Sequence, residues 1–85
     1  MQRLSIIIPV YNEEGTIKQV IEKVKSVKLK DFFKEIIVVE DCSTDKTKEV
    51  LKNIKDDSLK MFYHNTNKGK GAAIRTALKN STGDI

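Results

Sequence analysis

The chain has 85 residues, of which 39% are hydrophobic and 33% are charged. This composition is typical of a single folded globular domain and excludes a disordered or low-complexity segment, so we treat residues 1–85 as one domain. No apolar run approaches the ~18 residues that a membrane span needs, and the N-terminus lacks the pattern of a secretory signal. We therefore expect neither secretion nor a transmembrane helix.

Charge and cysteine content narrow the class further. The 16 Lys and Arg residues outnumber the 12 Asp and Glu residues, which gives a net charge of +4 that suits nucleic acid, an anionic membrane surface or phosphorylated small molecules. The lysines mostly alternate with apolar helix positions, and no basic stripe carries interleaved aromatics, so a nucleic-acid partner is not expected. Cys42 is the only cysteine, which excludes an internal disulfide and is consistent with a cytoplasmic protein.

Three strand-like runs are present, at residues 4–10, 35–40 and 59–64. The first two are β-branched runs without polar alternation, which predicts strands that are buried on both faces, as in a parallel sheet covered by helices. In the third run, Phe62 faces the side opposite to Leu59, Met61 and Tyr63.

Apolar residues at helical spacing predict three helices, at residues 17–27, around 50–54 and at about 71–82. Asn12 is the expected cap of the first helix, and Ser43 or Thr44 the expected cap of the second. The resulting order β-α-β-α-β-α predicts right-handed crossovers and a Rossmann-like, three-layer half of an α/β fold with strand order 3-2-1.

Asp84 and Ile85 read as the opening of a fourth strand, so we expect the chain to be truncated before strand 4 of a larger sheet. The first strand would then be an exposed edge. Exposed edges pair readily with another chain, which predicts a homodimer through strand 1.

Unusual residues follow all three predicted strands, at the edge where such sheets bind ligands. Tyr11 follows the first strand and offers a ring for base stacking, while Glu13 could accept ribose hydroxyls. Asp41 follows the second strand and could accept the ring N–H of uracil or guanine. In the Lys-Gly-Lys-Gly loop at residues 68–71, glycines would let backbone N–H groups approach a diphosphate, and Lys68 or Lys70 would add positive charge.

Each of these residues also has a purely structural explanation. Tyr11 suits a half-buried loop position, and Glu13 suits the first turn of a helix. The loop at residues 69–71 lacks the spacing of a P-loop, and it follows the third strand, whereas a dinucleotide fingerprint follows the first. His64 has no partner at a catalytic or metal spacing and reads as a strand-end residue, and Cys42 as a passive turn residue. The prediction of a site therefore rests on co-location.

Four segments resemble the signatures of family 2 glycosyltransferases with the GT-A fold: residues 5–13, 37–47, 67–75 and 82–84. They read SIIIPVYNE, IVVEDCSTDKT, NKGKGAAIR and TGD. The match covers essentially the whole chain in the right order and corresponds to the N-terminal portion of the family. It is closest to members that resemble dolichyl- or polyprenyl-phosphate mannosyl and glucosyl synthases.

The resemblance implies an inverting transfer of a hexose from a UDP- or GDP-linked sugar to an acceptor such as a polyprenyl phosphate at the cytosolic membrane surface. It implies that Asp41 recognises the base and that the loop at residues 68–71 lies near the donor phosphates. The nucleotide-binding residues that follow are Pro9, Tyr11, Glu13, Asp41, Lys68, Gly69, Lys70 and Gly71. The chain departs from the family pattern where Glu40 replaces the usual aspartate and Cys42 the usual glycine, so the turn after the second strand could differ in shape.

The family's metal-binding Asp-x-Asp and its catalytic base follow the strand expected after Asp84 and Ile85. We therefore predict no catalytic residue and no metal ligand in this chain, with Mg²⁺ or Mn²⁺ belonging to a full-length relative and the fragment itself inactive. A non-catalytic nucleotide-binding or regulatory module is the alternative. A receiver-type signalling domain would need an aspartate where His64 and Asn65 stand. The sugar, the base and the acceptor stay open.

Overall fold

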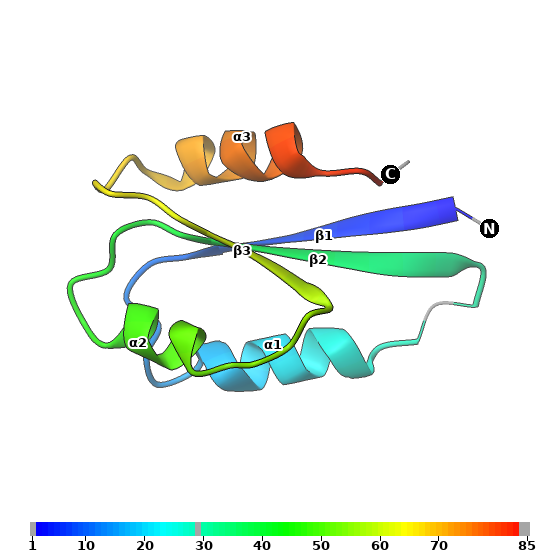
Figure 1. The fold of residues 1–85 in the computed structure, drawn as a ribbon, viewed down its shortest axis with the longest axis horizontal. Helices are drawn as coiled ribbons and strands as arrows, with labels where there is room; N and C mark the ends of the chain where they lie inside the picture. The colour runs from blue at the N-terminus through cyan, green and yellow to red at the C-terminus, as the bar shows by residue number, and fades with distance from the viewer. Residues whose placement is uncertain (1, 29, 84–85) are drawn as a thin grey trace.

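The computed structural model describes residues 2–28 and 30–83 as a parallel sheet between two helical layers (Figure 1). The strands β1 (Gln2–Val10), β2 (Phe32–Glu40) and β3 (Leu59–Tyr63) lie in the order β1-β2-β3, which is the predicted order 3-2-1 read from the other edge. Helices α1 (Ile17–Ser26) and α2 (Thr47–Lys52) cover one face, and α3 (Lys70–Asn80) covers the other. The predicted α/β architecture is confirmed. Asp84 and Ile85 lie outside the described residues.

Alternate residues of the buried strands supply the two apolar layers. Ile36 and Val38 pack with α1 and α2, whereas Ile37 and Val39 pack against Ala73 and Ala77 of α3. Phe62 lies on the α3 side and its neighbours on the other side, as the sequence predicts. Uninterrupted β-branched runs are thus explained by helices on both faces.

The loops after β1 and β2 are bonded to each other, and this changes two predicted helix caps. Asn12 does not cap α1: its N–H donates to Ser43 Oγ (2.9 Å), and its Oδ1 accepts from Thr44 N (2.8 Å). Consequently neither Ser43 nor Thr44 caps α2, which begins after Lys46. Instead, Asp45 Oδ1 accepts the N–H of Thr47 (2.9 Å). The polar side chains that could cap their own helices join two loops.

A buried carboxylate in the N-terminal half of β2 holds the segment that follows α3. Glu35 accepts hydrogen bonds from Ser5 Oγ (2.7 Å) and Thr82 N (2.9 Å) and pairs with Lys60. Burial alone would raise the pKa of Glu35, but the Lys60 ammonium and the Ser5 and Thr82 donors outweigh it and lower that pKa to about 2. A Cβ at Gly83 would lie 2.9 Å from Ser5 N, so a larger residue does not fit there.

None of the helices in the described part of the chain is long and apolar enough to cross a bilayer.

Candidate functional site

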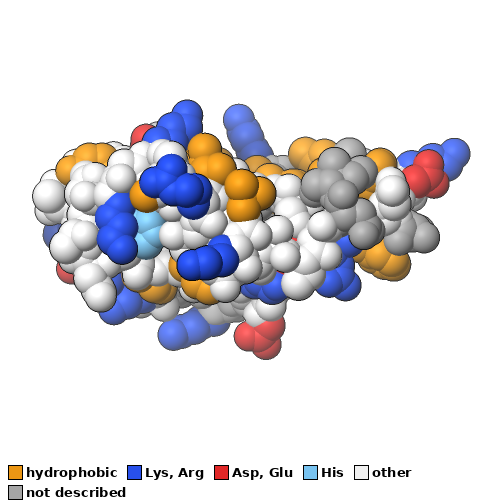
Figure 2. Space-filling model, turned by 90° about the horizontal axis from the view of Figure 1, so that it is seen from above, with side chains coloured by type: hydrophobic (Ala, Val, Ile, Leu, Met, Phe, Trp, Pro, Cys, Tyr) orange, Lys and Arg blue, Asp and Glu red, His pale blue; other side chains and the backbone are white. Residues whose placement is uncertain are grey.

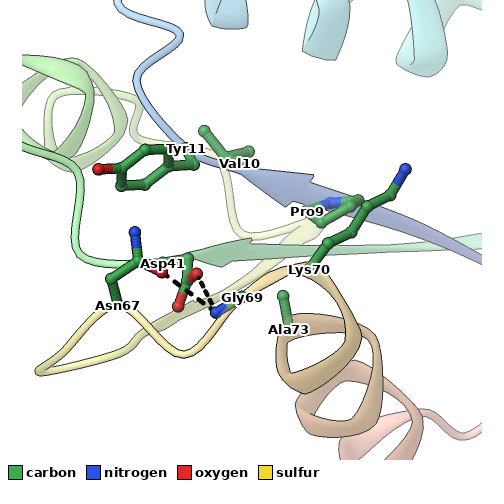
Figure 3. A pocket seen from close by; sticks show the side chains of 8 residues that line it. All are labelled: Pro9, Val10, Tyr11, Asp41, Asn67, Gly69, Lys70 and Ala73. Atoms are coloured by element: carbon green, nitrogen blue, oxygen red, sulfur yellow. Dashed lines mark hydrogen bonds between the residues drawn. The ribbon is translucent and has the colours of Figure 1, made fainter.

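The segments leaving the three strands meet at the carboxyl end of the sheet, around a hollow of about 360 Å³ (Figures 1 and 3). It is lined by Pro9, Val10, Tyr11, Asp41, Asn67, Gly69, Lys70 and Ala73. Residues of β1, of the turn after β2 and of the start of α3 therefore share one cavity. We refer to this cavity as the strand-end hollow.

Most of the predicted nucleotide-binding residues border the strand-end hollow, namely Pro9, Tyr11, Asp41, Gly69 and Lys70. Glu13 does not: its Oε2 accepts from Thr16 Oγ1 (2.8 Å), and its backbone N–H donates to Thr47 Oγ1 (2.8 Å). Gly71 is also outside the lining. Whether these residues bind a nucleotide stays a prediction.

Lys68 borders a different, shallower hollow on the outer side of α3, together with Arg75 and Lys79. Figure 2 looks onto this side of the molecule and shows several blue Lys and Arg side chains over α3. Lys68 contacts Asp41 through its backbone N–H, which donates to Asp41 Oδ1 (2.9 Å). Lys70 is therefore the cation of this loop that faces the strand-end hollow.

Asp41 is the most heavily bonded group of the strand-end hollow and is only 4% exposed. Its Oδ1 accepts from Lys68 N (2.9 Å) and lies 2.8 Å from His64 Nδ1, and its Oδ2 accepts from Gly69 N (2.8 Å; dashed in Figure 3). Burial would raise the pKa of Asp41, but the N–H groups of Lys68, His64 and Gly69 lower it below its ordinary value. The carboxyl is thus an anion at neutral pH.

The bonds of Asp41 leave one acceptor position open. An ionised carboxylate has about four lone-pair directions, and three donors occupy three of them. Since Oδ1 takes two donors, the remaining lone pair belongs to Oδ2. Asp41 can therefore hold its loop and still accept one hydrogen bond from a ligand.

Gly69 shapes the start of α3 beside the strand-end hollow. Gly69 has φ +90°, a conformation that L side chains rarely adopt, and it stands immediately before the helix. Its N–H is used by Asp41, so Gly69 shapes the turn and does not donate into the hollow. The next backbone N–H groups, in the first turn from Lys70 onward, have no acceptor within the helix and point outward at its N-terminus, which is the positive end of the helix dipole.

The turn after β2 keeps a glycine-like backbone although Cys42 replaces the family's glycine. Cys42 has φ +57°, which lies in the left-handed region, and its Sγ contacts Asn65 O at 3.4 Å.

Glu40 is fully buried, and its Oε1 accepts from Ser43 N (2.6 Å), while its Oε2 has no partner among the described residues. Burial and the charge of Glu40 raise the pKa of Tyr63.

Sequence reasoning missed four residues of this region. Val10, Asn67 and Ala73 line the strand-end hollow. Asn67 follows the Asn-x-Gly pattern of a turn, with Oδ1 accepting from Gly69 N (3.2 Å), so its place was open to inference. His64 lies one residue beyond β3, where the sequence predicts the last residue of the strand, and its ring contacts Asp41 and Thr76.

Within residues 2–28 and 30–83, no group of three or more His, Cys, Asp or Glu side chains converges closely enough to hold a metal ion.

This geometry defines a Rossmann-like α/β domain whose strand-end hollow lies at the carboxyl ends of its strands. Residues 5–85 match the sequence profile of Glycosyl transferase family 2, and the chain belongs to that family. The predicted resemblance, which includes members that use dolichyl and polyprenyl phosphates, is thereby confirmed.

Two curated relatives and one solved structure illustrate the similarity. The chain is 37% identical to dolichyl-phosphate beta-glucosyltransferase ALG5A of Trichomonas vaginalis, over 96% of this chain and 28% of the relative. It is 34% identical to undecaprenyl-phosphate 4-deoxy-4-formamido-L-arabinose transferase of Proteus mirabilis, over 100% of this chain and 27% of the relative.

The crystal structure of S. aureus TarS 1-349 superposes with a TM-score of 0.75 at 32% identity, over 98% of this chain and 25% of that one. The chain thus spans 28% and 27% of the lengths of the two curated relatives named above.

Proposed function

We propose that this chain is the nucleotide-binding part of a glycosyltransferase that moves a hexose from a UDP- or GDP-linked sugar to an acceptor such as a polyprenyl phosphate. The observation that carries the proposal is the strand-end hollow, where an exposed aromatic, a buried carboxylate with one open lone pair and a helix N-terminus with a lysine meet. The names of the two curated relatives, which act on dolichyl and undecaprenyl phosphates, support the choice of acceptor class.

The nucleoside end of the donor fits between Tyr11 and Asp41. The Tyr11 ring is 42% exposed and is available for stacking on a base. The open lone pair of Asp41 Oδ2 accepts N3–H of uracil or N1–H of guanine. Cytosine has no such N–H, so the carboxylate selects against it.

The diphosphate end of the donor lies at the start of α3. Lys70 supplies a positive charge at the strand-end hollow, and the unpaired N–H groups of the first helical turn supply donors. Gly69 supports this arrangement because its left-handed backbone turns the chain into the helix while its own N–H anchors Asp41. Glu13 lies outside the lining of the hollow, and its carboxylate accepts from Thr16 Oγ1, so the ribose contact of Glu13 stays a prediction.

Sugar transfer itself belongs to the whole protein. We propose that a divalent metal, Mg²⁺ or Mn²⁺, acts in the complete enzyme at a site outside the described residues, which hold no converging ligand group. Such an ion neutralises the charge that develops on the leaving diphosphate. The 85-residue chain is then a donor-binding unit that does not transfer sugar alone, and the complete enzyme works on the cytosolic side of the membrane that carries its acceptor.

The test is a titration of the isotopically labelled chain with UDP, GDP, CDP and N3-methyl-UDP. We expect UDP or GDP to shift the amide signals around Tyr11, Asp41 and Lys70, and CDP and N3-methyl-UDP to bind at least about tenfold more weakly than UDP because the charge-assisted hydrogen bond is missing. Only the nucleotide differs between these titrations, so the protein and its fold are the same in all of them. Equal affinity for UDP, GDP, CDP and the methylated analogue would refute base recognition by Asp41.

We also propose that β1 pairs with the β1 of a second copy. Among the described strands, β1 has β2 as its single neighbour, so β1 is an edge strand of the described sheet, and edge strands are prone to pair with another chain. Sedimentation velocity over a concentration series should detect a dimer. A dimer with a dissociation constant in the millimolar range becomes detectable at about 1 mM. A monomer at all concentrations up to this value would refute the pairing.

A further inference from the structure

His64 contacts Asp41 of the strand-end hollow without lining the hollow itself. It directly follows β3, and its backbone N–H donates to Glu40 O (2.8 Å), which extends the pairing of β3 with β2 by one step. Its side chain is 8% exposed and appears in Figure 2 as a small pale blue area. Nδ1 lies 2.8 Å from Asp41 Oδ1, and Nε2 lies 2.7 Å from Thr76 Oγ1 of α3. One ring therefore joins the end of β2 to the middle of α3.

The protonation of the ring follows from its partners. Asp41 is ionised and can only accept, so Nδ1 of His64 carries a proton and donates to Oδ1. In the neutral ring Nε2 then accepts from the hydroxyl of Thr76. Asp41 and Thr76 thus hold the ring from its two opposite nitrogens.

This chain of hydrogen bonds decides which oxygen of Asp41 is free. With His64 and Lys68 N both on Oδ1, a rotation of the carboxylate would break two bonds at once. Without His64, each oxygen would keep a single backbone donor, Lys68 N on one and Gly69 N on the other. Each oxygen would then have one open lone pair, and two backbone donors in place of three donors would hold the plane of the carboxylate.

We propose that His64, held by Thr76, is a positioning residue for base recognition, which fixes the Asp41 carboxylate so that Oδ2 presents one lone pair to the nucleobase. The inference rests on the proposed function, since it assigns the source of selectivity within the same hollow. A ring that merely filled space would make no contribution to selectivity between bases. It would also be replaceable by any side chain of similar volume.

Two substitutions of His64 separate the two bonds of the ring. His64→Asn keeps an N–H near the position of Nδ1 and loses the reach to Thr76, whereas His64→Gln places its amide near Nε2 and loses the donor to Asp41. His64→Ala removes both, and Thr76→Val removes only the hydroxyl partner. Amide exchange within β2 reports whether each variant remains folded.

The first measurement needs no ligand. Hydrogen exchange at the amides of Lys68 and Gly69, which donate to Asp41, should accelerate about tenfold in His64→Ala and His64→Gln relative to the strand amides of β2. His64→Asn should restore most of the protection. Unchanged exchange at both amides in folded His64→Ala and His64→Gln would overturn the proposal.

The second measurement is the ratio of the dissociation constants of CDP and UDP. We expect this ratio to fall by about tenfold in His64→Ala and His64→Gln and to recover in His64→Asn, while a loss of general stability would weaken both nucleotides alike. An unchanged ratio in the folded variants would refute positioning by His64 while leaving the proposed function intact. Equal binding of CDP and UDP by the unaltered chain would instead refute the proposed base contact, and the exchange measurement alone would then decide the role of His64.

Discussion

Replacing Asp41 with Asn exchanges one acceptor oxygen for an NH₂ group that can only donate. Three N–H groups converge on the carboxylate, from His64, Lys68 and Gly69. The amide oxygen can accept two of them at most, so the third donor faces the new NH₂ group in a site that is 4% exposed. The substitution therefore removes charge-assisted bonds and leaves a buried donor unsatisfied.

The magnitude follows from these two losses. Weakening hydrogen bonds to a charged group costs about 1.5–3 kcal/mol, and a buried unsatisfied donor costs about 1–3 kcal/mol, so we expect a loss of roughly 2.5–6 kcal/mol. For a domain of this size, each kcal/mol lowers the midpoint of thermal unfolding by about 4–8 °C, which predicts a drop of at least about 10 °C. This is a large part of a total stability of about 5–10 kcal/mol.

The assay is urea and thermal unfolding followed by circular dichroism. Asp57→Asn is the matched control, because it makes the same chemical change at an exposed position and should alter stability by no more than about 0.5 kcal/mol. If Asp41→Asn unfolds within that margin of the unaltered chain, the three hydrogen bonds do not hold the site together, and the reasoning about the open lone pair is refuted as well.

Three further predictions test other parts of the structure. Because the folded pKa of Glu35 is lowered to about 2, its contribution to stability is complete above the ordinary pKa of 4.5 and is lost as the pH falls toward 2. Between pH 5 and pH 2.5, Glu35→Gln should therefore lose about 1–3 kcal/mol less free energy of unfolding than the unaltered chain loses. An equal loss in both, measured by urea titrations at the two pH values, would contradict this. Gly69→Ala should cost about 1–2 kcal/mol in urea unfolding because φ is +90°, whereas the control Gly71→Ala, inside the helix, should be neutral or stabilising; a reversed order would refute the assigned backbone. Lys70→Ala should lower the affinity for UDP about three- to tenfold and the affinity for uridine hardly at all, as measured by calorimetry. Lys79→Ala, which removes the same charge elsewhere on α3, is the control. An equal loss of affinity for UDP and uridine would contradict a phosphate contact by Lys70.

The sheet and the location of the site could be predicted from the sequence because they depend on patterns within single segments. Apolar runs on both faces, as in Ile36 to Val39, require helices above and below the sheet, and parallel strands bring their carboxyl ends to one edge. Tyr11, Asp41 and Gly69 meet for that reason alone.

The hydrogen-bond partners could not be predicted because they join residues far apart in the chain. Asn12 has the residue type of a helix cap, yet its best donors and acceptors lie 31 and 32 residues away, at Ser43 and Thr44. His64 and Asp41 are 23 residues apart, and their contact depends on the pairing register of β3 with β2. Nothing local to either residue sets that register.

The thin packing between α3 and the sheet has a consequence for substitutions that never touch a ligand. Ala73 and Ala77 are fully buried against Ile37 and Val39, and their single methyl groups determine how closely the helix axis approaches the strands. We expect a larger side chain at Ala77 to push α3 away from the sheet and so to change the position of its first turn, where Lys70 borders the strand-end hollow. The shape of the hollow therefore depends on a methyl group that lies outside its lining, between the helix and the sheet.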